Sequence, residues 1–317
     1  MPSAITPVRC SYETTAVMAY LVDAGRLTLI DTGGVAHPPG PIREALRDLG
    51  RDLDAVETIV NTHGHWDHAG GDGIVQAASN AGIIIHEAGT DLLRDPAVHT
   101  EGYATAAARL LVRPDLVAAQ VAAFPALFAD PVSAERTLFD GDTLDLGGGV
   151  VFSVLHVPGH SDDHVALWSE RDGVLIAGDA AQGTGSRRGG CPLYFGGIGQ
   201  ARMSIKRLKE VPFATLHVSH PFGRIGVDER ATIYDSAGGR AFLDDSLAAL
   251  DALEEALRAA LRDHPAAPFP ELARSATDHL ARAAPWPIVP DPVTGVPAAA
   301  VPTLHLIWQE MTEGDRP

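Results

Sequence analysis

THGHWDHAGG, residues 62–71, follows a β-branched run and carries three histidines and one aspartate within six positions. His63 and His65 lie two residues apart where a strand runs out, so an extended backbone would send both imidazoles to the same side. Asp67 and His68 follow after one residue, and the glycines beyond them allow a sharp turn into a helix. Nitrogen ligands with one carboxylate and no thiolate are typical of a catalytic zinc or a similar first-row ion. The string therefore predicts a metal site at a strand end.

The composition excludes several classes of function. The chain has 317 residues, with 24 Lys and Arg against 41 Asp and Glu, a formal net charge of −17. Binding to nucleic acid or to an anionic membrane needs clustered Lys and Arg, which this sequence does not offer, so we expect neither partner. No stretch approaches the ~18 consecutive apolar residues of a membrane span. The first nine residues lack a basic leader followed by an apolar core, so we expect a cytoplasmic protein.

Strand and helix signals divide the chain into parts. The first part alternates strands and helices, residues 91–130 change to an Ala- and Leu-rich helical insertion, and strands then return. We expect a catalytic domain over residues 1–235, with this insertion, and a C-terminal helical extension over residues 236–317 packed on the same domain. Leucines between 243 and 261 recur every three or four residues, so they lie on one helix face. That face would cover the core or, equally, a second copy in a homodimer.

The pattern H-x-H-x-D-H after a strand resembles the signature of the metallo-β-lactamase superfamily. The resemblance spans roughly residues 15–225 and implies an α/β fold, a four-layer αββα sandwich of two similar halves with the metals at one edge of the paired sheets. It implies further ligands in order along the chain. His160 follows in Pro158-Gly159-His160-Ser161, Asp179 in a Gly-Asp pair after an apolar strand, and His220 at the end of a late strand.

The resemblance distributes these ligands over two divalent cations, most often Zn²⁺, with Mn²⁺ and Fe²⁺ as alternatives. One cation would be held by His63, His65 and His160. The other would be held by Asp67, His68 and His220, and Asp179 would bridge the two.

Three further positions belong to the same pattern. Asp31 stands in an Asp-Thr-Gly turn whose aspartate, in the family, supports a ligand rather than binding the metal. His164 resembles a second histidine often found after the P-G-H turn. His217 is a rival to His220, but it would point to the opposite face of a regular strand, and ligands gather at strand ends on loops.

The resemblance also implies the chemistry. Two cations that share a water lower its pKa and supply a bridging hydroxide at neutral pH, which attacks the substrate carbonyl. Asp67 and Asp179 would act as catalytic residues as well as ligands, and Tyr194, in the Gly-rich loop of residues 183–199, would contact the carbonyl oxygen. Phe124, Leu127 and Phe128 of the insertion would either roof an acyl pocket or pack against the sandwich.

The ligand set and the family favour a glyoxalase II-like or lactonase-like hydrolase that cleaves a small-molecule carboxylic ester, lactone or thioester. A mononuclear iron oxygenase of the same superfamily is the alternative, as is a phosphodiester or β-lactam hydrolase. A binding module with a vestigial site is disfavoured because no expected ligand is missing.

Overall fold

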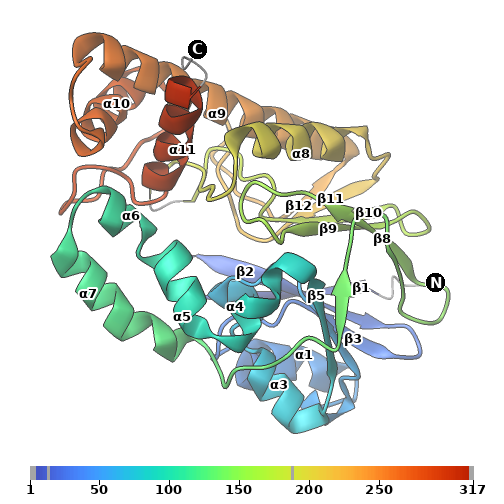
Figure 1. Cartoon of the computed structure of the whole chain (residues 1–317). Helices are drawn as coiled ribbons and strands as arrows, with labels where there is room; N and C mark the ends of the chain where they lie inside the picture. Colours follow the sequence, from blue (N-terminus) through green and yellow to red (C-terminus); the bar gives the residue numbers. More distant parts are fainter. Residues whose placement is uncertain (1–4, 13–14, 187–188, 314–317) are drawn as a thin grey trace.

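The computed structural model describes residues 5–12, 15–186 and 189–313, and in this part of the chain two six-stranded sheets face each other (Figure 1). The first sheet, in the order β1-β2-β3-β4-β5-β6, contains Ile5–Ser11 (β1), Ala16–Asp23 (β2), Leu27–Ile30 (β3), Thr58–Val60 (β4), Gly82–His86 (β5) and Arg136–Leu138 (β6). The second, in the order β12-β11-β10-β9-β8-β7, contains Thr143–Asp145 (β7), Val151–His156 (β8), Val165–Ser169 (β9), Val174–Gly178 (β10), Thr215–Val218 (β11) and Ile233–Asp235 (β12).

Helices cover the outer face of each sheet. Arg43–Asp48 (α1) and Asp72–Ser79 (α3) lie on the first sheet, and Ile198–Glu210 (α8) and Ser236–Asp263 (α9) lie on the second (Figure 1). The layers therefore follow the order helix, sheet, sheet, helix, which confirms the expected αββα sandwich.

The sequence of β2 shows why the sheets pack face to face. Successive side chains of a strand point to opposite faces. Val17 and Leu21 belong to the core under α1 and α3, whereas Met18, Tyr20 and Val22 belong to the core between the two sheets. Because both faces of this strand are buried, its apolar run is continuous rather than alternating with polar residues.

Two edge strands, β1 and β12, have no clear signal in the sequence. β1 contains Pro7, which lacks an N–H, and this is tolerated because only one side of an edge strand is paired. β12 is three residues long and pairs with β11 alone.

A helical insertion and a C-terminal extension meet on one side of the sandwich. The insertion between β5 and β6 contains Thr90–Arg94 (α4), Pro96–His99 (α5), the π-helical turn Thr100–Ala104 (η4), Ala106–Leu110 (α6) and Pro114–Ala123 (α7). The extension adds Phe269–Ala283 (α10) and Ala300–Glu313 (α11) after α9. α6 contacts α11, so the two helical segments close over the same side of the molecule (Figure 1).

The leucine face of α9 is buried within the chain. Leu243, Leu250, Leu253 and Leu257 are almost fully inaccessible, and α9 packs against α8, α10 and α11. The face therefore covers the core, and a homodimer stays a prediction. Among the described residues, no helix combines the length and apolarity that crossing a membrane requires.

Candidate metal centre

The predicted ligands converge where strands of both sheets end. The loop after β4 holds His63 and His65, and the short helix Trp66–Ala69 (α2) follows with Asp67 and His68. In the second sheet, His160 follows β8, Asp179 follows β10 and His220 follows β11. Their ligand atoms fall into three groups, each within 4.8 Å: His63, His65 and His160; His63, His68 and Asp179; Asp67, His68 and His220. The structure thus brings all seven side chains together.

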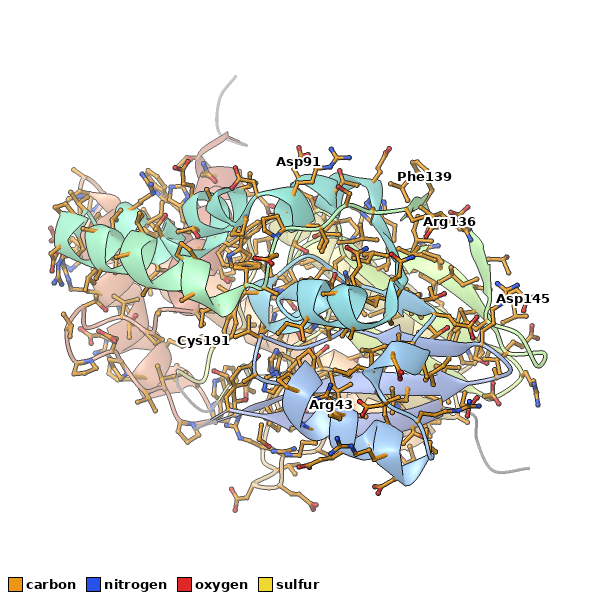
Figure 2. All side chains as sticks on the ribbon, turned by 90° about the horizontal axis from the view of Figure 1, so that it is seen from below. Arg43, Asp91, Arg136, Phe139, Asp145 and Cys191 are labelled. Atoms are coloured by element: carbon orange, nitrogen blue, oxygen red, sulfur yellow. The ribbon has the colours of Figure 1, made fainter. Side chains whose placement is uncertain are left out.

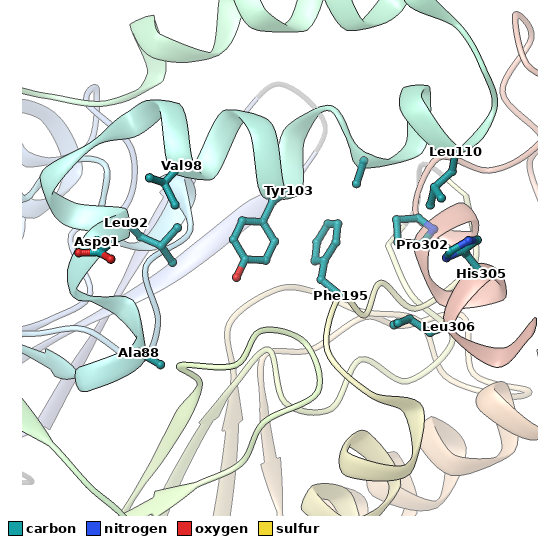
Figure 3. Close-up of a pocket in the computed structure, with 12 residues that line it drawn as sticks. Ala88, Asp91, Leu92, Val98, Tyr103, Leu110, Phe195, Pro302, His305 and Leu306 are labelled. Atoms are coloured by element: carbon teal, nitrogen blue, oxygen red, sulfur yellow. The ribbon is translucent and has the colours of Figure 1, made fainter. Parts of the chain in front are cut away.

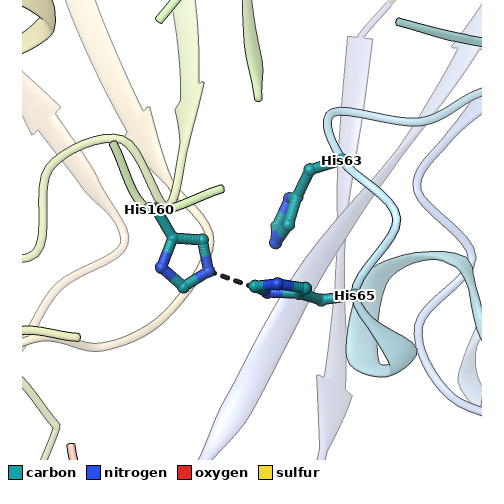
Figure 4. A group of neighbouring side chains, drawn as sticks. All are labelled: His63, His65 and His160. Carbon is teal, nitrogen blue, oxygen red and sulfur yellow. Dashed lines mark hydrogen bonds between the residues drawn. The ribbon is translucent and has the colours of Figure 1, made fainter. Parts of the chain in front are cut away.

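The first group consists of three imidazoles turned toward one point (Figure 4). His160 Nε2 lies 2.9 Å from His65 Nδ1. The ring of His63 lies 4.6 Å from that of His65 and 5.0 Å from that of His160, centroid to centroid. Two facing ring nitrogens need a proton or a cation between them, and three imidazoles around a cation are a recurrent catalytic zinc arrangement.

Asp179 lies between the first group and the group formed by Asp67, His68 and His220. His220 Nε2 lies 3.3 Å from Asp67 Oδ2 and 3.4 Å from Asp179 Oδ2. Asp179 also lies 3.9 Å from His68 Nε2 through Oδ1 and 3.5 Å from His160 Nε2 through Oδ2. The Asp179 carboxylate therefore faces both groups at once, as a bridging ligand must.

Hydrogen bonds fix which nitrogen of each ring faces the centre. His68 Nδ1 pairs with Asp31 Oδ2 (2.8 Å), His160 Nδ1 with the Leu193 carbonyl (2.8 Å) and His220 Nδ1 with the Ala16 carbonyl (2.7 Å). Because these oxygens only accept, each Nδ1 carries a proton, and Nε2 is the nitrogen of each ring that faces the centre. Such outward bonds to oxygen are what orient metal-binding histidines.

The protonated nitrogen of His63 is set by the Thr62 hydroxyl group. Thr62 Oγ1 donates its single proton to Asp31 Oδ2 (2.8 Å), so it can only accept from His63 Nδ1, 3.1 Å away. His63 Nε2 is thereby left with a lone pair directed into the centre. His65 has the opposite ring orientation, because its Nδ1 rather than its Nε2 faces His160 and the centre.

The inward-facing atoms fit divalent cations. His63 Nε2, His68 Nε2 and Asp179 Oδ1 are buried and have no hydrogen-bond partner among the described residues. Buried polar atoms normally find partners, so this cluster calls for a ligand. Burial, reinforced by neighbouring histidines, lowers the pKa of His63 and His65 well below the ordinary value, which keeps both imidazoles in the neutral form that binds metals.

Negative charge is concentrated on Asp179 and Asp67, beside His220. Burial alone would raise the pKa of Asp179, but His220 and the other histidines lower it well below its ordinary value. Burial alone would lower the pKa of His220, but Asp179 and Asp67 raise it well above its ordinary value. The two carboxylates are therefore anions that attract positive charge to this position.

Asp163 ties two ligand loops together, and the sequence analysis missed it. Its Oδ2 accepts from the Gly64 N–H (2.7 Å), between His63 and His65, and its Oδ1 accepts from the Ser161 hydroxyl (2.6 Å), next to His160. In the sequence, the only indication of this role is that two aspartates, Asp162 and Asp163, directly precede His164.

Aromatic residues from the insertion and the Gly-rich loop wall the centre. The Tyr103 ring lies 4.5 Å from that of His65, and the Phe195 ring lies 5.7 Å from it. His99 Nε2 accepts from the Trp66 N–H at 3.4 Å. Tyr103 and His99 were not predicted as site residues, since nothing local in the sequence indicates that they approach His65. Phe195 belongs to the Gly-rich loop of residues 183–199, for which a substrate loop and an ordinary surface loop were equal alternatives.

The remaining predicted residues occupy less central places. The Tyr194 side chain is fully buried and its hydroxyl donates to the Ala180 carbonyl (3.4 Å), so its contact with substrate stays a prediction. His164 Nε2 accepts from the Asp179 N–H (2.9 Å), which places it as a support of that ligand. His217 contacts Tyr20 and belongs to none of the three groups. In the Gly-rich loop, residues 187–188 lie outside the described residues.

Phe124 and Phe128, for which a pocket roof and packing against the sandwich were equal alternatives, pack against Trp66 and His99. The Phe124 ring lies 6.4 Å from Trp66 and 6.2 Å from His99, and the Phe128 ring lies 5.2 Å from His99. Packing is therefore the better account of the two phenylalanines.

Comparison with known proteins agrees with this geometry. Residues 13–220 match the family model of the metallo-beta-lactamase superfamily. The chain belongs to this superfamily. A hydroxyacylglutathione hydrolase from Rhodospirillum rubrum is 28% identical over 176 residues, which cover 56% of this chain and 51% of that protein. A hydroxyacylglutathione hydrolase from Methylobacillus flagellatus is 31% identical over 193 residues, which cover 60% of this chain and 56% of that protein. The chain thus matches about half the length of these superfamily relatives.

Solved structures show the same fold. A metallo-beta-lactamase family protein from Thermus thermophilus superposes with a TM-score of 0.68 at 24% identity, covering 98% of this chain and 93% of that chain. A metallo-beta-lactamase from Cronobacter sakazakii superposes with a TM-score of 0.58 at 22% identity, covering 81% of this chain and 96% of that chain. The high coverage by the Thermus protein includes the helical extension as well as the sandwich.

Proposed function

We propose that this protein is a metal-dependent hydrolase that holds two divalent cations, most often Zn²⁺, and cleaves a carboxylic ester, lactone or thioester. The observation that carries the proposal is a set of buried, inward-facing atoms on His63, His68 and Asp179 that have no hydrogen-bond partner in the described part of the chain. They lie inside a cluster of five imidazoles and two carboxylates. The curated relatives named hydroxyacylglutathione hydrolase support an acyl compound as substrate.

His63, His65 and His160 would hold one cation, Asp67, His68 and His220 the other, and Asp179 both. Bound there, such cations supply a water of lowered pKa and positive charge beside the substrate carbonyl. In the overall reaction a bond forms between the water oxygen and the acyl carbon. The bond to the leaving oxygen or sulfur breaks, and that atom takes up a proton.

Asp67 is the chain's candidate for moving that proton. The pKa of Asp67 is lowered because His220 and His68 outweigh the effect of burial, so its carboxylate is an anion at neutral pH. The Asp67 side chain is 20% exposed to solvent, whereas the Asp179 side chain is 7% exposed. Asp67 therefore lies on the more open side of the centre. Its carboxylate is therefore placed to accept a proton and return it to the leaving group.

The proposed ligands all lie within residues 1–235, and we propose this range as the catalytic unit, with residues 236–317 as an extension packed on it. The extension contributes through α11. The Thr303 hydroxyl accepts from the Tyr194 N–H (2.9 Å) and so supports the loop that follows Asp179.

The test combines metal analysis with a substrate panel. Protein purified with zinc, manganese or iron is assayed on a p-nitrophenyl ester, a lactone, a thioester, a β-lactam and a phosphodiester, with oxygen uptake recorded. We expect bound metal and hydrolysis of an acyl substrate that His65→Ala abolishes and that His279→Ala, a change on α10 outside the centre, leaves intact. Metal-loaded protein that cleaves only the phosphodiester or the β-lactam, or consumes oxygen without hydrolysis, would overturn the proposal.

A further inference from the structure

A cavity of about 440 Å³ lies between the helical insertion and α11 (Figure 3). Its volume falls within the range of small-molecule sites. The described residues that line it come from the segment between the turn Glu87–Gly89 (η3) and α6, from the loop after Asp179 and from α11.

Most of the described side chains in the lining are apolar. Its polar side chains are Asp91, His305 and Tyr103, and Asp91 and His305 stand at opposite ends of the cavity (Figure 3). The Asp91 side chain keeps 76% of its exposure and lies at the surface of the molecule (Figure 2). Burial lowers the pKa of His305, so its ring is neutral at pH 7. An uncharged, apolar group fits such walls best.

The cavity shares a wall with the metal centre. Tyr103 and Phe195 line it, and their rings lie 5.0 Å apart and pack edge-on against His65. Leu92 also lines it and touches the backbone of Gly64, since a Cβ atom at Gly64 would come within 2.8 Å of the Leu92 side chain. A molecule in the cavity is therefore separated from the ligand loop by single side chains.

We propose that this cavity binds an uncharged aliphatic acyl chain of several carbons while the scissile carbonyl lies at the metal centre, with Tyr103 and Phe195 as specificity-determining residues between the two. The inference rests on the proposed hydrolase function and goes beyond it, because it names the acyl group. A short polar acyl group would leave the apolar walls of Leu92, Leu110 and Leu306 unfilled.

Acyl chain length is the variable that tests the cavity. With metal-loaded protein and p-nitrophenyl acetate, butanoate and hexanoate, we expect kcat/KM to rise about fourfold for each added methylene, the factor that ~0.8 kcal/mol per buried methylene gives. Ala106→Phe on α6 fills the cavity and should remove this rise with chain length. Ala119→Phe on the exposed face of α7 is the matched control and should keep the full rise.

A binding measurement on the unaltered protein covers the case in which Ala106→Phe does not fold. We expect hexanamide to bind at least tenfold more tightly than acetamide, by ligand-observed NMR. Equal binding of the two amides, or acetate turnover with no dependence on chain length, would overturn the cavity assignment and leave the proposed function standing. Tighter binding of hexanamide without turnover of any ester would instead overturn the proposed function alone.

Discussion

Replacing Asp163 by alanine tests the residues that support the metal centre without changing a proposed ligand. The carboxylate accepts from the Gly64 N–H at 2.7 Å and from the Ser161 hydroxyl at 2.6 Å, and both donors are buried. Each buried donor left without an acceptor costs ~1–3 kcal/mol. Burial raises the pKa of Asp163, so removing the charge recovers part of that cost. We expect the free energy of unfolding of the metal-free protein to fall by ~2–4 kcal/mol.

The same change should weaken metal binding without removing a ligand. Asp163 holds the backbone between His63 and His65, and loss of such supporting groups costs ~10–100-fold in metal affinity. Urea unfolding measures the stability, and competition with a chromophoric zinc chelator measures the affinity. Asp162→Ala is the matched control, because it is the neighbouring aspartate and its side chain is exposed. The reasoning fails if Asp163→Ala and Asp162→Ala bind zinc equally well and unfold at the same urea concentration.

Three further outcomes follow from the site and its surroundings. Chelator treatment should lower the melting temperature and abolish hydrolysis, and added zinc should restore both, because binding to the folded state alone stabilises it; an unchanged melting curve after verified metal removal would contradict this. Asp31→Ala should weaken zinc binding by ~10–100-fold, because His68 Nδ1 loses its acceptor, and unchanged affinity in the chelator competition would refute that role. Burial raises the pKa of Asp72 to about 7, so folding takes up a proton and stability falls as the pH rises from about 4 to about 7. Asp72→Asn should flatten this slope in urea unfolding of the metal-free protein, and an identical slope would count against it.

Local patterns predicted the first metal-binding string, and the family resemblance that this string carries implied the fold class and the later ligands. His63, His65, Asp67 and His68 lie within six consecutive positions, and their order after a strand already favours a metal site. The later ligands each follow a recognisable apolar strand, as His220 follows β11. The resemblance implies a sandwich that brings such strand ends to one edge, and the structure places these residues together there.

Long-range contacts could not be predicted in this way. Asp163 and Gly64 are 99 positions apart in the chain, and no periodicity links them. Tyr103 lies on a short π-helical turn of the insertion, and its approach to His65 depends on how that insertion folds back over the sheet edge. The short strand β12 is likewise defined by its pairing with β11 rather than by its own composition.

Anomalous diffraction at the zinc absorption edge, from a crystal of the zinc-loaded protein, tests the central claim most directly. We predict two peaks, one among His63, His65 and His160 and one among Asp67, His68 and His220, with Asp179 touching both. Peaks at other positions, or none at this sheet edge in protein shown to be saturated with zinc, would contradict the assignment of the centre.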